Sequence, residues 1–85
     1  MILAIDIGNT NIVIGCIKDD KILFTERMST DSNKTVLEYA IGFKTVLELY
    51  HIHTEDLTGS NISSVVPPVT NTVRKALHKI THHQA

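Results

Sequence analysis

The chain is poor in the residues that would indicate extracellular or membrane chemistry. It has one cysteine, no tryptophan, two prolines and four glycines in 85 residues. The single cysteine, Cys16, excludes an intrachain disulfide and fits a reducing cytosol. No apolar run approaches the roughly 20 residues of a membrane span, and no secretory signal is evident. We therefore expect a cytoplasmic protein with no membrane partner.

An excess of charge of either sign is also lacking. Eight Lys and Arg side chains oppose nine Asp and Glu side chains, which gives a formal net charge of -1. This balance gives no electrostatic reason to expect nucleic acid as a partner. Hydrophobic residues make up 42% of the chain, which is typical of a soluble globular protein. A chain of 85 residues forms one domain at most.

Two common phosphate-binding motifs do not occur. Gly-x-x-x-x-Gly-Lys-Ser/Thr is missing, which excludes the P-loop mechanism. Gly-x-Gly-x-x-Gly is missing as well, which removes the fingerprint of the dinucleotide-binding folds. If the chain binds a phosphate group, it must do so with another arrangement of residues.

The hydrophobic pattern predicts six elements in the order β-β-β-α-β-α. Short apolar or alternating runs bounded by turn residues indicate strands, and apolar residues at helical spacing indicate helices. The predicted strands cover residues 2–5, 12–17, 22–28 and 61–66, and the predicted helices cover residues 36–50 and those from Pro67 onward. Residues 54–57 resemble a short capped turn.

This order predicts an α/β fold with a mixed sheet. Three strands joined by short turns should pair antiparallel, and a strand–helix–strand connection favours a right-handed crossover to a fourth, parallel strand. The first two strands are apolar at almost every position. We therefore expect both of their faces to be buried.

Both helices carry signals for their first residue and for the face that they bury. Thr35 and Glu38 have the spacing of a capping box, and Pro67 suits a first helical position. Gly42 is an unfavourable residue inside a helix. The predicted core stripe of the first helix consists of Val36, Ala40, Phe43, Leu47 and Tyr50, widened by Leu37 and Ile41. That of the second helix consists of Val69, Val73, Ala76, Leu77 and Ile80.

The most informative segment lies between the first two strands. It reads Asp6-Ile7-Gly8-Asn9-Thr10-Asn11, a carboxylate and a glycine followed by three small hydrogen-bonding residues. Such a turn can offer backbone N–H groups and side-chain donors to phosphate oxygens, with Asp6 placed to meet a divalent cation directly or through water. The alternative is an ordinary hydrophilic hairpin turn, because the same residue types are common in turns. The residues alone favour neither interpretation.

Other candidate residues have simpler explanations. His78 and His82 have the spacing of a helical metal pair but lack an evident third ligand. His51 and His53 are expected to be exposed residues of a connection, and Cys16 a small core residue. The basic residues Arg74, Lys75 and Lys79 are expected to form a solvated helix face.

Two serines at the end of the fourth predicted strand remain open. Ser63 and Ser64 lie at the edge where sheets of this kind bind ligands. A role in packing, or in starting the following helix, explains them equally well.

Three segments resemble type III pantothenate kinase. They are Met-Ile-Leu-Ala-Ile-Asp-Ile-Gly-Asn-Thr-Asn-Ile-Val-Ile-Gly at the start of the chain, Arg-Met-Ser-Thr at residues 27–30, and Ile-Ser-Ser-Val-Val-Pro-Pro at residues 62–68. The Asp-x-Gly-Asn-Thr-Asn form is narrower than the Asp-x-Gly signal shared by actin, the sugar and acetate kinases and the heat-shock chaperone ATPases. The resemblance implies part of a ribonuclease-H-like (actin-like ATPase) domain and covers essentially the whole chain.

The resemblance also implies an activity, namely ATP-dependent phosphorylation of pantothenate to 4'-phosphopantothenate, the first step of coenzyme A biosynthesis. Asp6 would hold Mg²⁺ through water near the phosphates, and Gly8 would permit close backbone approach. Asn9, Thr10 and Asn11 would donate to phosphate oxygens. The implied cofactor-binding segment is completed by the flanking residues Ile7, Ile12 and Val13. A monovalent cation (K⁺ or NH₄⁺) and a homodimer of the full-length enzyme are further implications.

The resemblance implies that residues 1–85 are the N-terminal part of the first nucleotide-binding domain, without the rest of that domain or the second domain. The family's Gly-x-Asp-Arg motif, whose aspartate is the proposed general base, does not occur here. We therefore expect no catalytic residue in this chain and no activity from it alone. Two alternatives remain: a non-catalytic accessory or regulatory protein of the same fold, or another small-molecule kinase of the superfamily.

Overall fold

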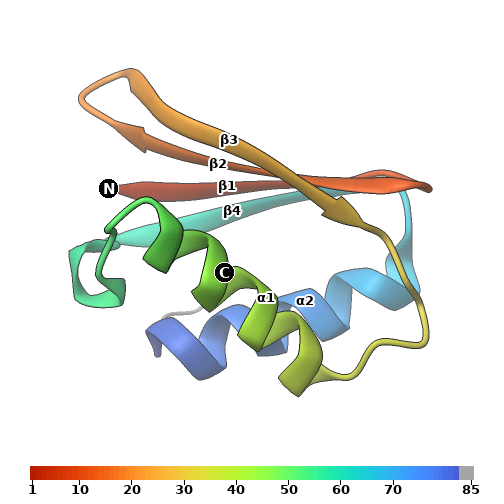
Figure 1. Cartoon of the computed structure of the whole chain (residues 1–85). Coiled ribbons are helices and arrows are strands. Elements are labelled where there is room, and N and C mark those ends of the chain that lie inside the picture. The colour runs from red at the N-terminus through yellow and green to blue at the C-terminus, as the bar shows by residue number, and fades with distance from the viewer. Residues whose placement is uncertain (83–85) are drawn as a thin grey trace.

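The computed structural model describes residues 1–82 and confirms the predicted order of elements (Figure 1). A short 3-10 helix, η1, adds one turn that the sequence pattern does not resolve as helical. The elements are β1 (Ile2–Ile7), β2 (Asn11–Lys18), β3 (Lys21–Ser29), α1 (Val36–Leu49), η1 (Thr54–Asp56), β4 (Gly59–Ser64) and α2 (Pro67–Thr81). None of the described helices is long and apolar enough to cross a membrane.

The four strands form one mixed sheet in the order β3-β2-β1-β4. Strand β1 pairs antiparallel with β2 and parallel with β4, and β2 pairs antiparallel with β3. The predicted topology of three antiparallel strands and one parallel strand is therefore confirmed. The β1–β2 hairpin and the first residues of both helices lie at the same end of the molecule, on the right in Figure 1.

The helices cover only one face of the sheet (Figure 1). Strand residues alternate accordingly, and the other face, which we call the open face, carries Ile2, Ala4 and Asp6 from β1. Ile2 is 40% exposed. The expectation that both faces of β1 and β2 are buried is therefore wrong for the described chain, because α1 and α2 lie on the same side. The buried core consists of Leu3, Ile5, Ile7, Ile12, Ile14, Cys16, Phe24, Tyr39, Ala40, Phe43, Leu47, Leu57, Val69, Val73, Ala76 and Leu77.

A β-bulge decides which residues of β3 face the core. The pairing of β2 with β3 shifts between Cys16 and Ile17, so that Ile17 pairs with Ile22 but Cys16 pairs with Phe24. The extra residue, Leu23, reverses the alternation along the rest of the strand. As a result Phe24 is buried among the core residues, and the later odd-numbered residues of β3 lie on the open face.

Helix α1 begins as predicted and buries the centre of the predicted stripe, Ala40, Phe43 and Leu47, but it differs from the prediction at the edges of that stripe. Both hydrogen bonds of the Thr35–Glu38 capping box are present. Leu37 and Ile41, however, are 59% and 56% exposed, whereas Tyr39 is fully buried. Burial of this tyrosine is possible because its hydroxyl donates to the Asp31 carbonyl and accepts from the Asp31 N–H, at 2.8 Å and 2.9 Å.

The unfavourable glycine of α1 has a packing reason. A Cβ on Gly42 would lie 2.7 Å from the terminal Cε of Met28 on β3. The flexible tip of Met28 thus occupies the space that a side chain on Gly42 would take. The helix ends at Leu49, one residue before the predicted Tyr50, whose ring stacks on Phe24 at a centroid distance of 4.1 Å.

Two predicted boundaries differ around β4. The strand covers residues 59–64 instead of 61–66, because Ser64 Oγ accepts from the Val66 N–H and turns the chain toward α2. Helix α2 then begins at Pro67 as predicted and buries four of the five predicted stripe residues, with Ile80 partly buried. The turn at residues 54–56 is helical, but no side chain caps it, so the predicted cap is wrong.

Candidate functional site

The loop that joins β1 to β2 differs from an ordinary two-residue hairpin turn. It comprises residues 8–10, and its first N–H group, on Gly8, donates to the Asn11 carbonyl at 2.9 Å. All three loop residues, which lie within the described chain, have negative φ angles. The turn between β2 and β3, by contrast, has φ values of 53° at Asp19 and 63° at Asp20, as the common type I' hairpin turn requires.

Gly8 stands where the loop is tightest. A Cβ at this position would lie 3.2 Å from the Asn11 carbonyl oxygen, closer than side chains usually approach backbone. The glycine thus allows the two ends of the loop to come together. Asn9 and Thr10 are exposed, while the flanking Ile7 and Ile12 are fully buried. The loop therefore has a polar, exposed tip, and the residues on either side of it are anchored in the core.

Residues beyond β3 hold this loop from the side. Thr30 Oγ1 donates to the Gly8 carbonyl at 2.7 Å, and the Thr30 N–H donates to the Thr10 carbonyl at 2.9 Å. Two carbonyls of the loop are thus engaged by one residue that is 20 or more positions away in the sequence. Reasoning from the sequence did not assign a function to Thr30, although the Arg-Met-Ser-Thr segment that contains it was part of the resemblance.

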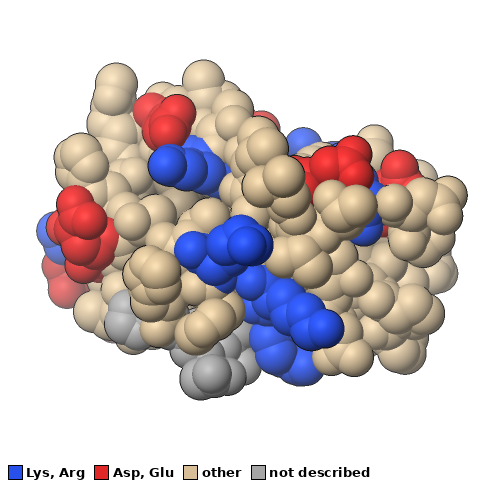
Figure 2. All heavy atoms as spheres, turned by 90° about the horizontal axis from the view of Figure 1, so that it is seen from below, with Lys and Arg blue, Asp and Glu red and all other residues tan. Residues whose placement is uncertain are grey.

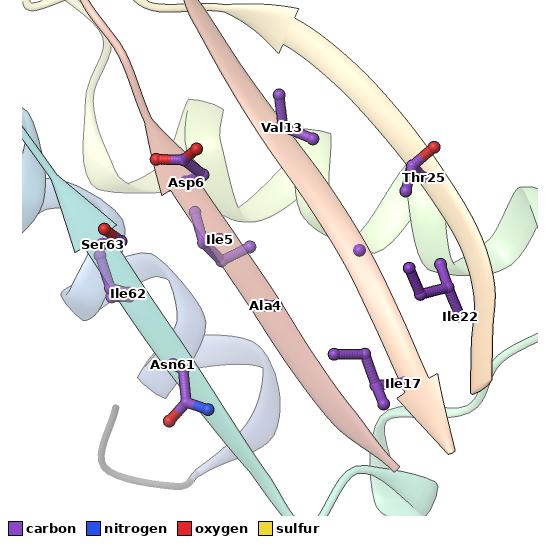
Figure 3. A pocket seen from close by; sticks show the side chains of 11 residues that line it. Ala4, Ile5, Asp6, Val13, Ile17, Ile22, Thr25, Asn61, Ile62 and Ser63 are labelled. Atoms are coloured by element: carbon purple, nitrogen blue, oxygen red, sulfur yellow. The ribbon is translucent and has the colours of Figure 1, made fainter. Parts of the chain in front are cut away.

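Asp6 lies on the open face, next to the last residue of β1. It pairs with Val13 on β2 and with Ser63 on β4, so the side chains of these three residues leave the same face of the sheet. Figure 3 shows Asp6 and Ser63 side by side on neighbouring strands. The Asp6 carboxylate is exposed and has no hydrogen bond or ion pair within residues 1–82. It is free to bind a ligand from solvent.

Further polar residues share this end of the open face. Arg27 pairs with Val13, and Ser29 pairs with Asn11. The row across the sheet therefore reads Ser63, Asp6, Val13 and Arg27. Arg27 is exposed and forms no ion pair with a described residue. The sequence does not show that Arg27 lies on the open face, because its position depends on the register of β3, and the bulge shifts that register.

The rest of the open face is a shallow apolar hollow of about 430 Å³ (Figure 3). Its lining residues come from all four strands and include Ala4, Val13, Ile17 and Ile22. Asp6 and Ser63 mark its polar end, beside the loop. The hollow and the loop thus share one border, formed by the last residues of β1 and β4.

A metal ion would have one candidate ligand here. Within residues 1–82, no three His, Cys, Asp or Glu side chains converge on one point. A single exposed carboxylate such as Asp6 is suited to Mg²⁺, which retains several waters and is commonly shared with substrate phosphates. Both α1 and α2 begin at this end of the sheet (Figure 1), and the positive ends of their dipoles favour an anion there.

The remaining candidates lie elsewhere. Arg74, Lys75 and Lys79 are exposed on α2, and Figure 2 shows basic side chains gathered on the helix side of the molecule, away from the open face. His78 and His82 are neighbours with a ring-centroid distance of 6.5 Å, but no third ligand joins them among the described residues.

The other three candidates are two exposed histidines and one buried cysteine. His51 and His53 are exposed in the connection after α1, as expected. Cys16 is a core residue, and its burial raises the pKa of the thiol. These residues take no part in the loop or the open face.

Comparison with known proteins places this arrangement in one family. The family model described as type III pantothenate kinase matches residues 2–85. The chain is similar to the type III pantothenate kinase of Finegoldia magna, with 46% identity over 79 residues that cover 93% of this chain and 30% of that protein. It is also similar to that of Brevibacillus brevis, with 40% identity over 85 residues that cover all of this chain and 33% of that protein.

A third relative, from a Sulfurihydrogenibium species, carries the same name and is 42% identical over 80 residues. The chain spans about a third of the length of these relatives. The match includes β1, the loop, β3 and the β4–α2 connection, the segments that form the site described above. The chain belongs to the type III pantothenate kinase family.

Proposed function

We propose that this chain carries the phosphate-binding part of an enzyme that phosphorylates pantothenate to 4'-phosphopantothenate with ATP, the first step of coenzyme A biosynthesis. The observation that supports the proposal most directly is the position of Asp6. Its free carboxylate lies beside a glycine-containing loop whose exposed tip consists of Asn9 and Thr10. The family membership supplies the reaction class.

Phosphoryl transfer depends mainly on positioning and on neutralising charge. Asp6 would hold Mg²⁺ through water, and the ion would supply positive charge that neutralises the phosphates. The loop residues Gly8–Asn11 would donate N–H and side-chain hydrogen bonds to the same phosphates. Arg27, on the same row of the open face as Asp6, would add a positive charge at the border of the site. In this proposal the chain grips and orients the nucleotide.

The chain alone would be catalytically silent. Gly-x-Asp-Arg does not occur in its sequence, and a base that accepts the proton of the substrate hydroxyl typically contributes on the order of a hundredfold or more to the rate. The proposal extends to the whole protein: a cytoplasmic homodimer that uses K⁺ or NH₄⁺ as monovalent cation and binds neither membranes nor nucleic acid.

A chimera tests the function. Residues 1–85 would replace the matching part of the Finegoldia magna relative, and pantothenate-dependent ADP release would be measured with saturating Mg²⁺ and ATP. We expect an active chimera, and a loss of several orders of magnitude in turnover on Asp6→Asn. Glu48→Gln and Glu55→Gln, on exposed carboxylates of α1 and η1, serve as matched controls and should retain activity within a few-fold. Near-normal turnover of Asp6→Asn would remove this residue from the mechanism.

The chimera also separates the proposal from its main alternative. An accessory protein of the same fold would give a folded chimera that binds ATP but does not phosphorylate pantothenate.

A further inference from the structure

The two hydrogen bonds from Thr30 determine how the loop presents its backbone. One engages the carbonyl of Gly8 and the other the carbonyl of Thr10. In a trans peptide the C=O and the following N–H point in opposite directions, and no peptide bond of the described chain is cis. Holding these two carbonyls toward Thr30 therefore turns the N–H groups of Asn9 and Asn11 toward the opposite side of the loop.

Two backbone N–H groups at the tip of the loop, those of Asn9 and Thr10, have no hydrogen-bond acceptor within residues 1–82. The Gly8 carbonyl, which shares a peptide unit with the Asn9 N–H, and the Thr10 carbonyl are occupied by Thr30 instead of facing a ligand. An incoming anion would thus meet donors and be spared the repulsion of two carbonyl oxygens.

Thr30 is itself fixed by the helix layer. Its neighbour Asp31 is held through both backbone groups by the hydroxyl of Tyr39, which is fully buried in the core. Thr30 donates two hydrogen bonds to the loop, and its neighbour Asp31 makes two with Tyr39, so the exposed loop is linked to α1. The segment that follows β3 is a rigid support for the loop and not a free connection.

We propose that Thr30 is a positioning residue that sets the loop in its phosphate-accepting orientation before any ligand arrives. The identity of the ligand rests on the proposed function; the orientation of the loop does not. The hydroxyl carries the effect, because its bond to the Gly8 carbonyl is the one that a side-chain substitution removes. Preorganised donors bind an anion more tightly, since the loop need not be ordered on binding.

Thr30→Val tests this role, since it keeps the shape of the side chain and removes the hydroxyl. Thr30→Ser keeps the hydroxyl, and Thr25→Val is the matched control on β3, where the threonine is exposed and makes no side-chain hydrogen bond with a described residue. The 85-residue chain, labelled with ¹⁵N, would be studied first without ligand. The heteronuclear NOE of the Asn9 and Thr10 amides then reports the order of the loop.

We expect Thr30→Val to lower these NOE values, while Thr30→Ser and Thr25→Val resemble the original chain. Unchanged amide shifts along β4 would show that the fold persists. Titration with MgATP and with inorganic tripolyphosphate should then give a dissociation constant about tenfold higher for Thr30→Val, which corresponds to the net contribution of one hydrogen bond. Thr30→Ser should restore binding to within about twofold, which is under 0.5 kcal/mol.

The two ideas fail in different ways. A loop in Thr30→Val that is as ordered as in the original chain, with unchanged affinity for both probes, would overturn the positioning role. If the original chain shifts no loop amide with either probe, the phosphate-binding function itself is wrong. The ligand-free NOE values would still decide whether Thr30 orders the loop.

Discussion

Tyr39→Phe probes the connection between the core and the loop. The substitution keeps the buried ring and its contact with Phe43, at a ring-centroid distance of 6.0 Å, and removes only the hydroxyl. Two hydrogen bonds to the backbone of Asp31, of 2.8 Å and 2.9 Å, are lost. Each contributes about 1 kcal/mol net. Asp31 is exposed, so water can partly replace the hydroxyl, and we expect a loss of about 1–2 kcal/mol in the free energy of unfolding.

Urea unfolding followed by circular dichroism measures this loss at a protein concentration where the chain is monomeric. The slope should stay constant while the midpoint falls. Tyr50→Phe is the control, because that tyrosine is 39% exposed and its hydroxyl bonds to no residue among 1–82 except Glu26. It should leave the midpoint nearly unchanged. Equal effects of the two substitutions would refute the conclusion that the Tyr39 hydroxyl anchors the segment after β3.

Three further predictions follow from local geometry. Gly42→Ala should raise the free energy of unfolding by up to about 1 kcal/mol in the same urea assay. Alanine favours the helix, and the flexible tip of Met28 can move aside. Clear destabilisation would show instead that Met28 is held in place. Asp20→Gly should stabilise by about 0.5–1 kcal/mol, because it relieves a left-handed residue at φ 63°, and a lower midpoint would contradict this. The hydrogen bond to Glu26 raises the pKa of Tyr50. The contribution of this pair to stability is therefore present while the phenol is protonated and is lost as the pH rises through the raised pKa. Glu26→Gln should lower this pKa, as ultraviolet absorbance of tyrosinate would show, and an unchanged titration would argue against the pair.

The sequence predicted the elements because their signals are local. Apolar periodicity, the Thr35–Glu38 capping box and Pro67 each depend on residues close together in the chain, and the structure confirms all three. The Asp6-to-Asn11 segment was identified in the same way, from the residue types alone. Its role as a phosphate site stays a proposal.

Features that depend on a distant partner were missed. Tyr39 is buried because its hydroxyl reaches the backbone of Asp31. The apolar periodicity of the helix does not predict that contact. The contacts of Thr30 with the loop depend likewise on the register of β3. The exposure of the open face was missed because strand composition does not say on which side a helix will pack.

The bulge at Leu23 protects the register of the residues that hold the loop against a change in chain length far from the loop. With the bulge, Asn11 pairs with Ser29, and Thr30 arrives opposite Thr10. Deleting Leu23 would remove only the extra residue: Ile22 would still pair with Ile17 and Phe24 with Cys16, so every later residue of β3 would keep its partner on β2. The deletion lies seven residues from Thr30, about 23 Å along an extended strand. Losing this one residue would therefore leave Thr30 opposite Thr10, so the bulge can absorb a change in chain length before it reaches the residues that support the loop.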